Sequence, residues 1–133
     1  MSLINEEVDK QCNTFLTVFI QLIDLKDPVK LLEFFHPHAV LIHVGQSAKY
    51  GREELLEVMK EWVNMDAKIE AHPSKRLEAG HGDYLFDFGT MEFKFTDGNI
   101  WKCKYEFIYK REDGKYFLYR DQIEPIDETE NVK

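Results

Sequence analysis

The chain has 133 residues, of which 44% are hydrophobic and 14% aromatic, and this composition excludes an intrinsically disordered protein. Charged residues make up 32% of the chain and give it a net charge of −8. That acidic excess argues against nucleic acid and against an anionic membrane surface as partners, because both require a basic surface.

The first half of the chain predicts helices. From residue 5 to residue 24, apolar side chains recur with the 3.6-residue period of a helix and define one buried face: Val8, Cys12, Phe15, Leu16, Phe19, Leu22 and Ile23. A second helix is expected to begin at Pro28, with Asp27 as its cap, and to end at His36, because a residue before proline disfavours the helical conformation. A third helix follows Gly51 and presents one apolar face: Leu55, Leu56, Met59, Trp62 and Val63.

The second half predicts a meander of antiparallel strands over residues 68–79, 84–95, 99–110 and 115–124. An Asp-Gly pair separates the last three strands at 97–98 and again at 113–114, and this pair is the strongest short signal for a β-hairpin. Pro73 lies inside the first of these strands, so that strand is expected at a sheet edge or with a bend. Residues 38–44 predict a further strand between the second and third helices.

Helices followed by antiparallel strands predict a single α+β domain. We expect the order α-α-β-α-β-β-β-β within one domain over residues 1–133. Its core is expected at about residues 5–124, and residues 125–133 read as a polar, acidic tail.

The whole pattern resembles the SnoaL-like branch of the nuclear-transport-factor-like superfamily. The resemblance covers about residues 5–124 and is carried by a long first helix and three segments: DPVKLLEFF, then HPHAVLIHVG leading into YGREELLEVMKEW, and the closing DGKYFLYRDQIE. It implies a cystatin-like cone in which helices pack in the concave face of a curved, mainly antiparallel sheet around a pocket. Many members are homodimers. The fold hosts isomerases, cyclases, dehydratases and non-catalytic association domains, so the resemblance implies shape more strongly than activity.

Three histidines, His36, His38 and His43, lie close together in the sequence. On a strand at 38–44 the side chains of His38 and His43 point to opposite faces, and no carboxylate stands at metal-ligand spacing from them. The sequence therefore predicts no metal site, and no motif for a cofactor is present. We expect His36 near the surface, His38 at the outer face or end of the strand, and only His43 in the pocket.

The resemblance places His43 where ketosteroid isomerase-like members carry their aspartate general base. An imidazole, with an unperturbed pKa of about 6.5, suits proton transfer near neutral pH. The alternative interpretation is a pocket-lining or core histidine that makes one hydrogen bond. The oxyanion donors of the isomerases are not reproduced, because their tyrosine position falls on Phe19 and their acid position falls near Glu106, on the polar face of its strand.

Two further residues are candidates for acid or base chemistry. Tyr105 lies on the apolar face of its strand and could be a pocket donor or a core tyrosine. Asp121 is the nearest match to the late acidic residue of SnoaL-type polyketide cyclases. Neighbouring residues on a strand point to opposite faces, so only one of Asp121 and Arg120 can line the pocket. Either Asp121 lines it together with Tyr119, or Arg120 lines it together with Gln122, and the sequence leaves both alternatives open. The expected apolar lining is Phe15, Phe19, Phe35, Leu41, Trp62, Trp101 and Phe107.

The leading hypothesis for function is a homodimer that binds a small hydrophobic molecule in an internal pocket. The alternatives are an isomerase-, cyclase- or dehydratase-type enzyme with His43 as general base, and a non-catalytic association domain. We expect the dimer to form through the sheet, because residues 84–95 are apolar on both faces and the helices can cover only one. Cys12 and Cys103 have apolar neighbours, and no signal peptide or long apolar span is visible, which indicates a cytoplasmic location.

Overall fold

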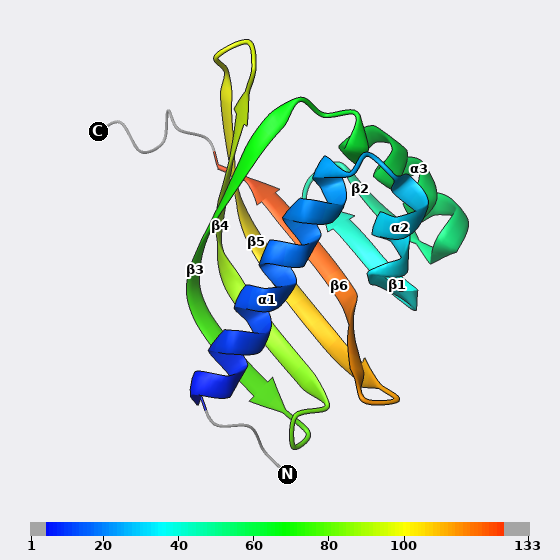
Figure 1. The fold of residues 1–133 in the computed structure, drawn as a ribbon, viewed down its shortest axis with the longest axis vertical. Coiled ribbons are helices and arrows are strands. Elements are labelled where there is room, and N and C mark those ends of the chain that lie inside the picture. The colour runs from blue at the N-terminus through cyan, green and yellow to red at the C-terminus, as the bar shows by residue number, and fades with distance from the viewer. Residues whose placement is uncertain (1–4, 127–133) are drawn as a thin grey trace.

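One six-stranded sheet and three helices make up the protein in the computed structural model, which describes residues 5–126. The strands follow the order β2-β1-β6-β5-β4-β3, in which β1 and β6 are parallel and all other neighbours are antiparallel. The long helix α1 crosses the concave face of the curved sheet (Figure 1). The predicted α+β class is therefore confirmed. Residues 127–133 of the predicted acidic tail lie outside the described range.

The long helix α1 (Asn5–Asp24) packs one continuous stripe of side chains against the sheet, and this stripe confirms the predicted face. Its buried residues are Val8, Cys12, Leu16, Phe19 and Ile23. Phe15 and Leu22 are partly buried at the margins of the stripe. The spacing works because residues three and four apart lie on one side of a helix, so a single face supplies the whole contact.

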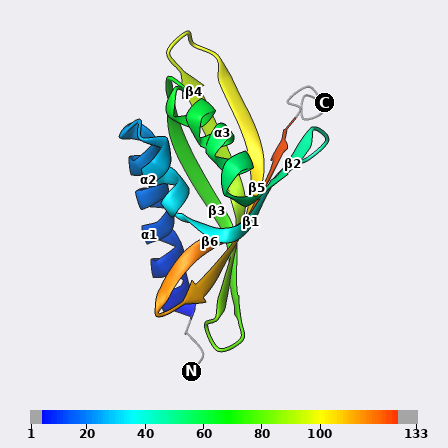
Figure 2. The same cartoon turned by 90° about the vertical axis from the view of Figure 1, so that its right-hand side faces the viewer.

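Two shorter helices, α2 (Pro28–Glu33) and α3 (Gly51–Val63), complete the layer on the concave side (Figure 2). Asp27 caps α2, since its carboxylate accepts hydrogen bonds from Val29 N at 3.1 Å and Lys30 N at 3.2 Å. The predicted end of this helix at His36 is wrong: α2 ends at Glu33, because the chain already pairs with β6 from the start of β1. No helix within residues 5–126 is both long and apolar enough to cross a membrane.

The strands agree with the sequence pattern except for one short addition. The predicted strands are β1 (Phe35–His43), β3 (Ala67–Ala79), β4 (Tyr84–Phe95), β5 (Ile100–Glu112) and β6 (Lys115–Pro125). The addition is β2 (Ser47–Tyr50), which pairs antiparallel with the end of β1 and was not predicted. Four residues of mixed polarity are too few to show the alternation of a strand, so only their pairing with β1 identifies them as a strand.

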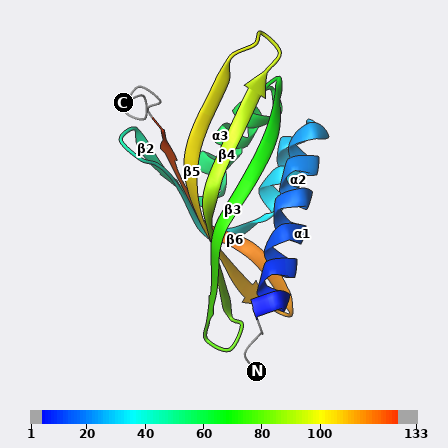
Figure 3. The ribbon, with the colours of Figure 1, turned by 90° about the vertical axis from the view of Figure 1, so that its left-hand side faces the viewer.

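The strand with the internal proline, β3, lies at the edge of the sheet as predicted (Figure 3). Its pairing with β4 shifts between Pro73 and Lys75. Gly89 lies opposite this irregularity, and a Cβ there would come within 2.5 Å of the His72 carbonyl oxygen and 2.8 Å of the Tyr105 ring. The absent side chain therefore permits β3 and the Tyr105 ring to approach the β4 backbone closely.

A β-bulge in β6 decides which residues of that strand face the helices. The pairing of β6 with β5 shifts in register and leaves Tyr119 as an extra residue. Leu118 before it and Asp121 after it are both buried, whereas the Tyr119 ring packs beside His36, 5.1 Å away between ring centroids. The alternative that placed Asp121 and Tyr119 together on the pocket face assumed unbroken alternation and is wrong in that respect. Asp121 faces inward, and Tyr119 does not accompany it.

One row of paired residues crosses all six strands on the concave side. From β3 to β2 it contains Arg76, Asp87, Phe107, Asp121, Leu41 and Lys49. Two buried aspartates thus stand on either side of Phe107, 0% and 1% exposed. The environments of the two aspartates differ: Asp87 belongs to a structural cluster, whereas Asp121 belongs to the candidate site.

The first aspartate, Asp87, belongs to a paired cluster that fastens α1 to the sheet. Its Oδ1 accepts hydrogen bonds from Arg76 Nε at 2.8 Å and from the Tyr105 hydroxyl at 3.1 Å. The same guanidinium reaches α1, where it donates to Asp9 Oδ1 at 3.2 Å and to Asn13 Oδ1 at 2.8 Å. Burial raises the pKa of Asp87, and the hydrogen bond and charge of Arg76 oppose that rise.

We expect the substitution Arg76→Ala to lower the free energy of unfolding by about 3–5 kcal/mol, because it leaves the Asp87 carboxylate buried without its cation. The matched control is Arg111→Ala, which breaks a more exposed pair with Asp83 and should cost less than about 1 kcal/mol. Urea denaturation at pH 7 measures both. Equal losses in the two variants would contradict the anchoring role of Arg76.

Candidate functional site

A cavity of about 340 Å³ lies between the sheet, the last turns of α1 and the end of α3. Its apolar lining comes from helices and strands alike: Phe19, Ile23, Trp62, Met65, Met91, Phe93, Trp101, Phe107 and Ile123. Four polar side chains also line it: His43, Gln46, Glu61 and Asp121. A mostly apolar cavity with a few convergent polar groups is typical of a small-molecule site.

The residues predicted to form the pocket divide into two groups. Those that line the cavity are His43, Asp121, Phe19, Trp62, Trp101 and Phe107. Of the others, Phe15 stacks on Tyr109 with 4.4 Å between ring centroids, and Phe35 is completely buried in the core. Leu41 lines an adjoining groove instead. From the sequence, aromatic residues on one face of a helix or strand could be assigned to the protein interior. The sequence could not distinguish those that line the cavity from those that pack in the solid core.

Tyr105 is also placed away from the cavity. Its hydroxyl donates to Asp87 Oδ1 at 3.1 Å, and its ring lies over Gly89. Burial, followed by the charge of Asp87, raises the pKa of Tyr105 far above its usual value. The hydroxyl therefore keeps its proton and holds Asp87, so it joins the structural cluster and does not meet His43.

His43 and Asp121 reach the same cavity because β1 and β6 run parallel and adjacent. Leu41 pairs with Asp121, and His43 pairs with Ile123. The imidazole therefore lies two residues farther along the strand direction than the carboxyl group. The turn after His43 is fixed by two backbone hydrogen bonds, from Val44 N to the Ile123 oxygen and from Gln46 N to the His43 oxygen, each 2.9 Å. Residues about 80 positions apart in the sequence thus share one wall.

Asp121 is the most unusual group in this wall. The residue is 1% exposed, and neither carboxylate oxygen has a hydrogen-bond partner among residues 5–126. Burial raises its pKa from 3.8 to about 7, so the carboxyl group is poised to hold or release a proton near neutral pH. A buried carboxyl group without a partner costs stability, and it is therefore a candidate for contact with a ligand.

His43 presents a second unsatisfied atom. Its Nε2 is buried without a hydrogen-bond partner within the described part of the chain. Its ring lies against Trp101, 6.1 Å between centroids and inclined at 68°. A neutral imidazole donates or accepts a hydrogen bond through this nitrogen, depending on its tautomer, so the cavity wall offers both a carboxyl group and an imidazole to a molecule inside it.

The three clustered histidines do not form a unit. His38 is exposed on the outer face, as predicted, whereas the expectation that His36 lies near the surface is wrong. The His36 side chain is only 4% exposed, with its Nε2 2.7 Å from Glu112 Oε1. Its Nδ1 accepts a hydrogen bond from His38 N at 3.0 Å. These contacts hold His36 in a structural role beneath the β5–β6 hairpin.

One group of potential metal ligands lies elsewhere on the molecule. Donor atoms of Glu70, His72 and Glu92 lie within 4.8 Å of one another among the described residues, on β3 and β4. Lysines already compensate these acids: Lys94 Nζ lies 3.1 Å from Glu70 Oε2, and Lys102 Nζ lies 3.8 Å from Glu92 Oε1. This group contributes nothing to the cavity, and the prediction that the protein has no functional metal stays a prediction.

A second hollow adjoins the cavity and has a different character. We call it the outer groove; it measures about 360 Å³ and runs between α3 and the β1–β2 hairpin. It shares part of its lining with the cavity: His43, Gln46, Glu61, Trp62 and Ile123. Its remaining lining is mainly polar: Leu41, Ser47, Lys49, Glu54, Glu57 and Val58.

Glu61 and Phe93 line the cavity, although neither was predicted as a site residue. Phe93 shares its strand face with Met91, so strand alternation could have indicated it. Glu61 precedes Trp62 on α3 and gave no signal of its own. Its role depends on where α3 lies relative to the sheet.

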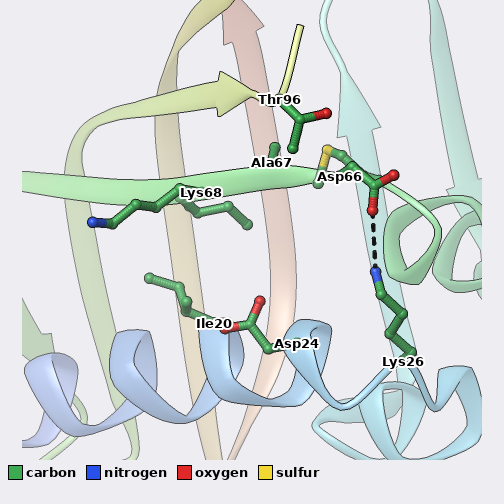
Figure 4. A pocket seen from close by; sticks show the side chains of 9 residues that line it. Ile20, Asp24, Lys26, Asp66, Ala67, Lys68 and Thr96 are labelled. Atoms are coloured by element: carbon green, nitrogen blue, oxygen red, sulfur yellow. Dashed lines mark ion pairs between the residues drawn. The ribbon is translucent and has the colours of Figure 1, made fainter. Parts of the chain in front are cut away.

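A further shallow groove lies at the junction of α1 and β3 (Figure 4). Lys26 and Asp66 form an ion pair across it, 3.7 Å between Nζ and Oδ1, and their side chains are 53% and 74% exposed. Lys26 Nζ also donates to the Val63 carbonyl oxygen at 2.9 Å. None of the buried atoms without a hydrogen-bond partner in the described part of the chain belongs to the lining of this groove, so it lacks the feature that marks the cavity.

We expect Asp121→Asn to change the pH dependence of stability. A raised carboxyl pKa means that the folded state holds the proton more tightly, so the wild-type protein loses stability as the pH rises from about 4 through about 7. Asparagine does not ionise, and the variant should exceed the wild type by up to about 4 kcal/mol at pH 8 while matching it near pH 4. Denaturant titrations at both pH values measure this, with the exposed Glu53→Gln as control. A difference that is the same at both pH values would contradict the assignment.

No protein-family model matches the sequence, and no curated protein matches it. Solved structures do match. A putative calcium/calmodulin dependent protein kinase II association domain from Xanthomonas campestris superposes with a TM-score of 0.76 at 18% identity, covering 89% of this chain and 87% of that chain. A protein of unknown function with a cystatin-like fold from Nostoc punctiforme gives 0.74 at 17%, covering 95% and 96%.

An enzyme-related name also occurs among the similar structures. A putative scytalone dehydratase from Novosphingobium aromaticivorans gives a TM-score of 0.71 at 12% identity, covering 92% of this chain and 87% of that chain. Further matches are described as NTF2-like proteins. Identities this low establish the fold and leave the activity open. The protein has the cystatin-like α+β fold of the NTF2-like proteins, in agreement with the resemblance in its sequence.

Proposed function

We propose that the protein is a homodimer that binds a small, largely apolar molecule in the cavity between the sheet and α3. The observation that carries this proposal is Asp121, a carboxyl group 1% exposed whose two oxygens lack a hydrogen-bond partner among residues 5–126 while lining an aromatic cavity. A protein that needed only a stable core would gain by replacing such a group with an apolar one. A bound molecule that hydrogen-bonds to Asp121 would offset its cost.

The second candidate function is an enzyme in which His43 acts as general base and Asp121 as general acid. Both groups line one cavity, and Asp121, with a pKa of about 7, can hold the proton that it would donate. Asp121 takes over the donor role first considered for Tyr105, which is committed to Asp87. The dehydratase name of one structural neighbour is compatible with this candidate.

A non-catalytic association domain is the third candidate, and another structural neighbour carries that name. Such a domain needs no internal cavity, and its own side chains could fill the space. The space of about 340 Å³ beside unsatisfied His43 and Asp121 atoms favours a ligand over this candidate.

The dimer proposal depends on the outer face of the sheet, which no helix of residues 5–126 covers. A row of paired residues crosses this face through all six strands: Leu77, Phe86, Ile108, Arg120, Val40 and Tyr50. Only one of these residues is charged, and Leu77 and Tyr50 are 45% and 59% exposed. An exposed, mainly apolar row that crosses a whole sheet is unusual on a monomer, and a twofold copy is the commonest way to cover it.

We expect His43→Ala to weaken binding of a ligand that hydrogen-bonds to the imidazole by about 5- to 150-fold. Small neutral aromatic ketones and alcohols, such as acetophenone and 2-naphthol, are suitable probes. Trp62 and Trp101 report binding directly by fluorescence, because both line the cavity and are the only tryptophans in the chain. His38→Ala, on the exposed outer face, is the control and should bind as the wild type does. If neither these probes nor a charged aromatic probe changes the tryptophan fluorescence of the wild type, the small-molecule proposal fails.

We expect the protein in solution to have about twice the monomer mass of 15.8 kDa when measured by multi-angle light scattering at micromolar concentration. Phe86→Glu places a charge in the apolar row of the outer face and should reduce the mass to that of the monomer. Thr14→Glu adds the same charge on the exposed side of α1 and should leave the dimer intact. A wild-type protein that stays monomeric would contradict the proposal.

A further inference from the structure

We propose that the cavity selects an organic cation, that is, an amine or quaternary ammonium group carried on an apolar body. This inference rests on the proposed small-molecule function and narrows it to a ligand class. Its basis is the combination of aromatic walls with acidic groups in a cavity that no lysine or arginine of residues 5–126 lines.

The walls suit a cation because aromatic faces carry negative electrostatic potential. Trp101 packs on Phe93 at 5.2 Å between ring centroids, and Trp62 packs against Phe19 at 5.9 Å. Phe107 lies 6.1 Å from Phe19 on the sheet side. Tryptophan is the strongest of the aromatic partners for a cation, and the attraction grows when the site excludes water. Aromatic residues on α1, α3 and the sheet therefore surround the space where an ammonium group would lie.

The charged groups of the lining have a single sign. Asp121 and Glu61 are both acids, and Asp121 lacks any partner for its carboxylate oxygens among the described residues. The nearest arginine in sequence, Arg120, faces the other side of the sheet, where it donates to Gln122 Oε1 at 2.7 Å. The bulge at Tyr119 sets the orientation of the residues that follow it, so the Asp121 carboxyl group points into the cavity and the Arg120 guanidinium points away from it. An anionic ligand would meet buried negative charge, whereas a cationic one would pair with it.

The outer groove continues the same electrostatic pattern. Glu54, Glu57 and Glu61 stand at helix spacings of three and four residues and line it from α3, and Lys49 is the only lysine or arginine that lines it within the described chain. The chain as a whole carries a net charge of −8. Negative potential along the approach raises the local concentration of cations and repels anions.

Three probes of similar size test the proposal: phenyltrimethylammonium, its neutral isostere tert-butylbenzene, and the anion phenylacetate. Each is titrated into the 133-residue protein at pH 8, above the pKa of about 7 of Asp121, with the fluorescence of Trp62 and Trp101 as readout. We expect the cation to bind at least about tenfold more tightly than the neutral isostere, with phenylacetate weakest.

Two variants locate the source of the preference. Asp121→Asn should weaken binding of phenyltrimethylammonium about tenfold or more and change binding of tert-butylbenzene less than about twofold, because only the charge is removed. Glu53→Gln removes an equal charge from the exposed side of α3 and should leave both affinities unchanged. Circular dichroism verifies that each variant is folded, and the wild-type comparison of probes does not depend on either variant.

The outcomes separate this inference from the proposed function. Binding of tert-butylbenzene as tight as that of the cation, or tighter binding of phenylacetate, overturns cation selection and leaves the small-molecule pocket standing. A wild-type protein whose tryptophans respond to none of the three probes overturns both.

Discussion

The parallel pairing of β1 with β6 is the contact on which the candidate site depends. It joins a strand that ends at His43 to one that begins at Lys115, and every other pair of neighbouring strands in the sheet is antiparallel. The backbone hydrogen bonds of this pair set the relative positions of His43 and Asp121 along the wall. The bulge at Tyr119 then turns Asp121 toward the helices, so the pairing with β1 and the bulge together decide which polar groups of this wall line the cavity.

The two aspartates beside Phe107 show how the same residue type serves two purposes. Asp87 is paired with Arg76 and Tyr105, and the guanidinium extends that pairing to α1, which holds the helix in place over the sheet. Asp121 has no such compensation, although it is as deeply buried. A buried charge that is paired contributes to the architecture, whereas one that is left unpaired is a cost that only a ligand or a proton relieves.

The site also shows why fold similarity does not determine activity here. The neighbouring structures share the curved sheet and its helices, yet their names range from an association domain to a dehydratase. The cavity of this chain is lined by acids and aromatic rings, with an imidazole in its wall and no lysine or arginine from the described residues. Function on a common fold follows from such side chains, because the backbone provides only their positions.

The sequence by itself determined the helices, the long strands and the order of these elements along the chain, because periodicity and turn residues act locally. The stripe from Val8 to Ile23 and the two Asp-Gly hairpins were readable without any partner. It also singled out His43 and Asp121 as candidates. It could not decide which face of β6 holds Asp121, whether Tyr105 meets the cavity or Asp87, or that Ser47–Tyr50 forms a strand. Those outcomes depend on a bulge, on a hydrogen bond between strands and on pairing with β1, and such contacts exist only once distant segments are packed together.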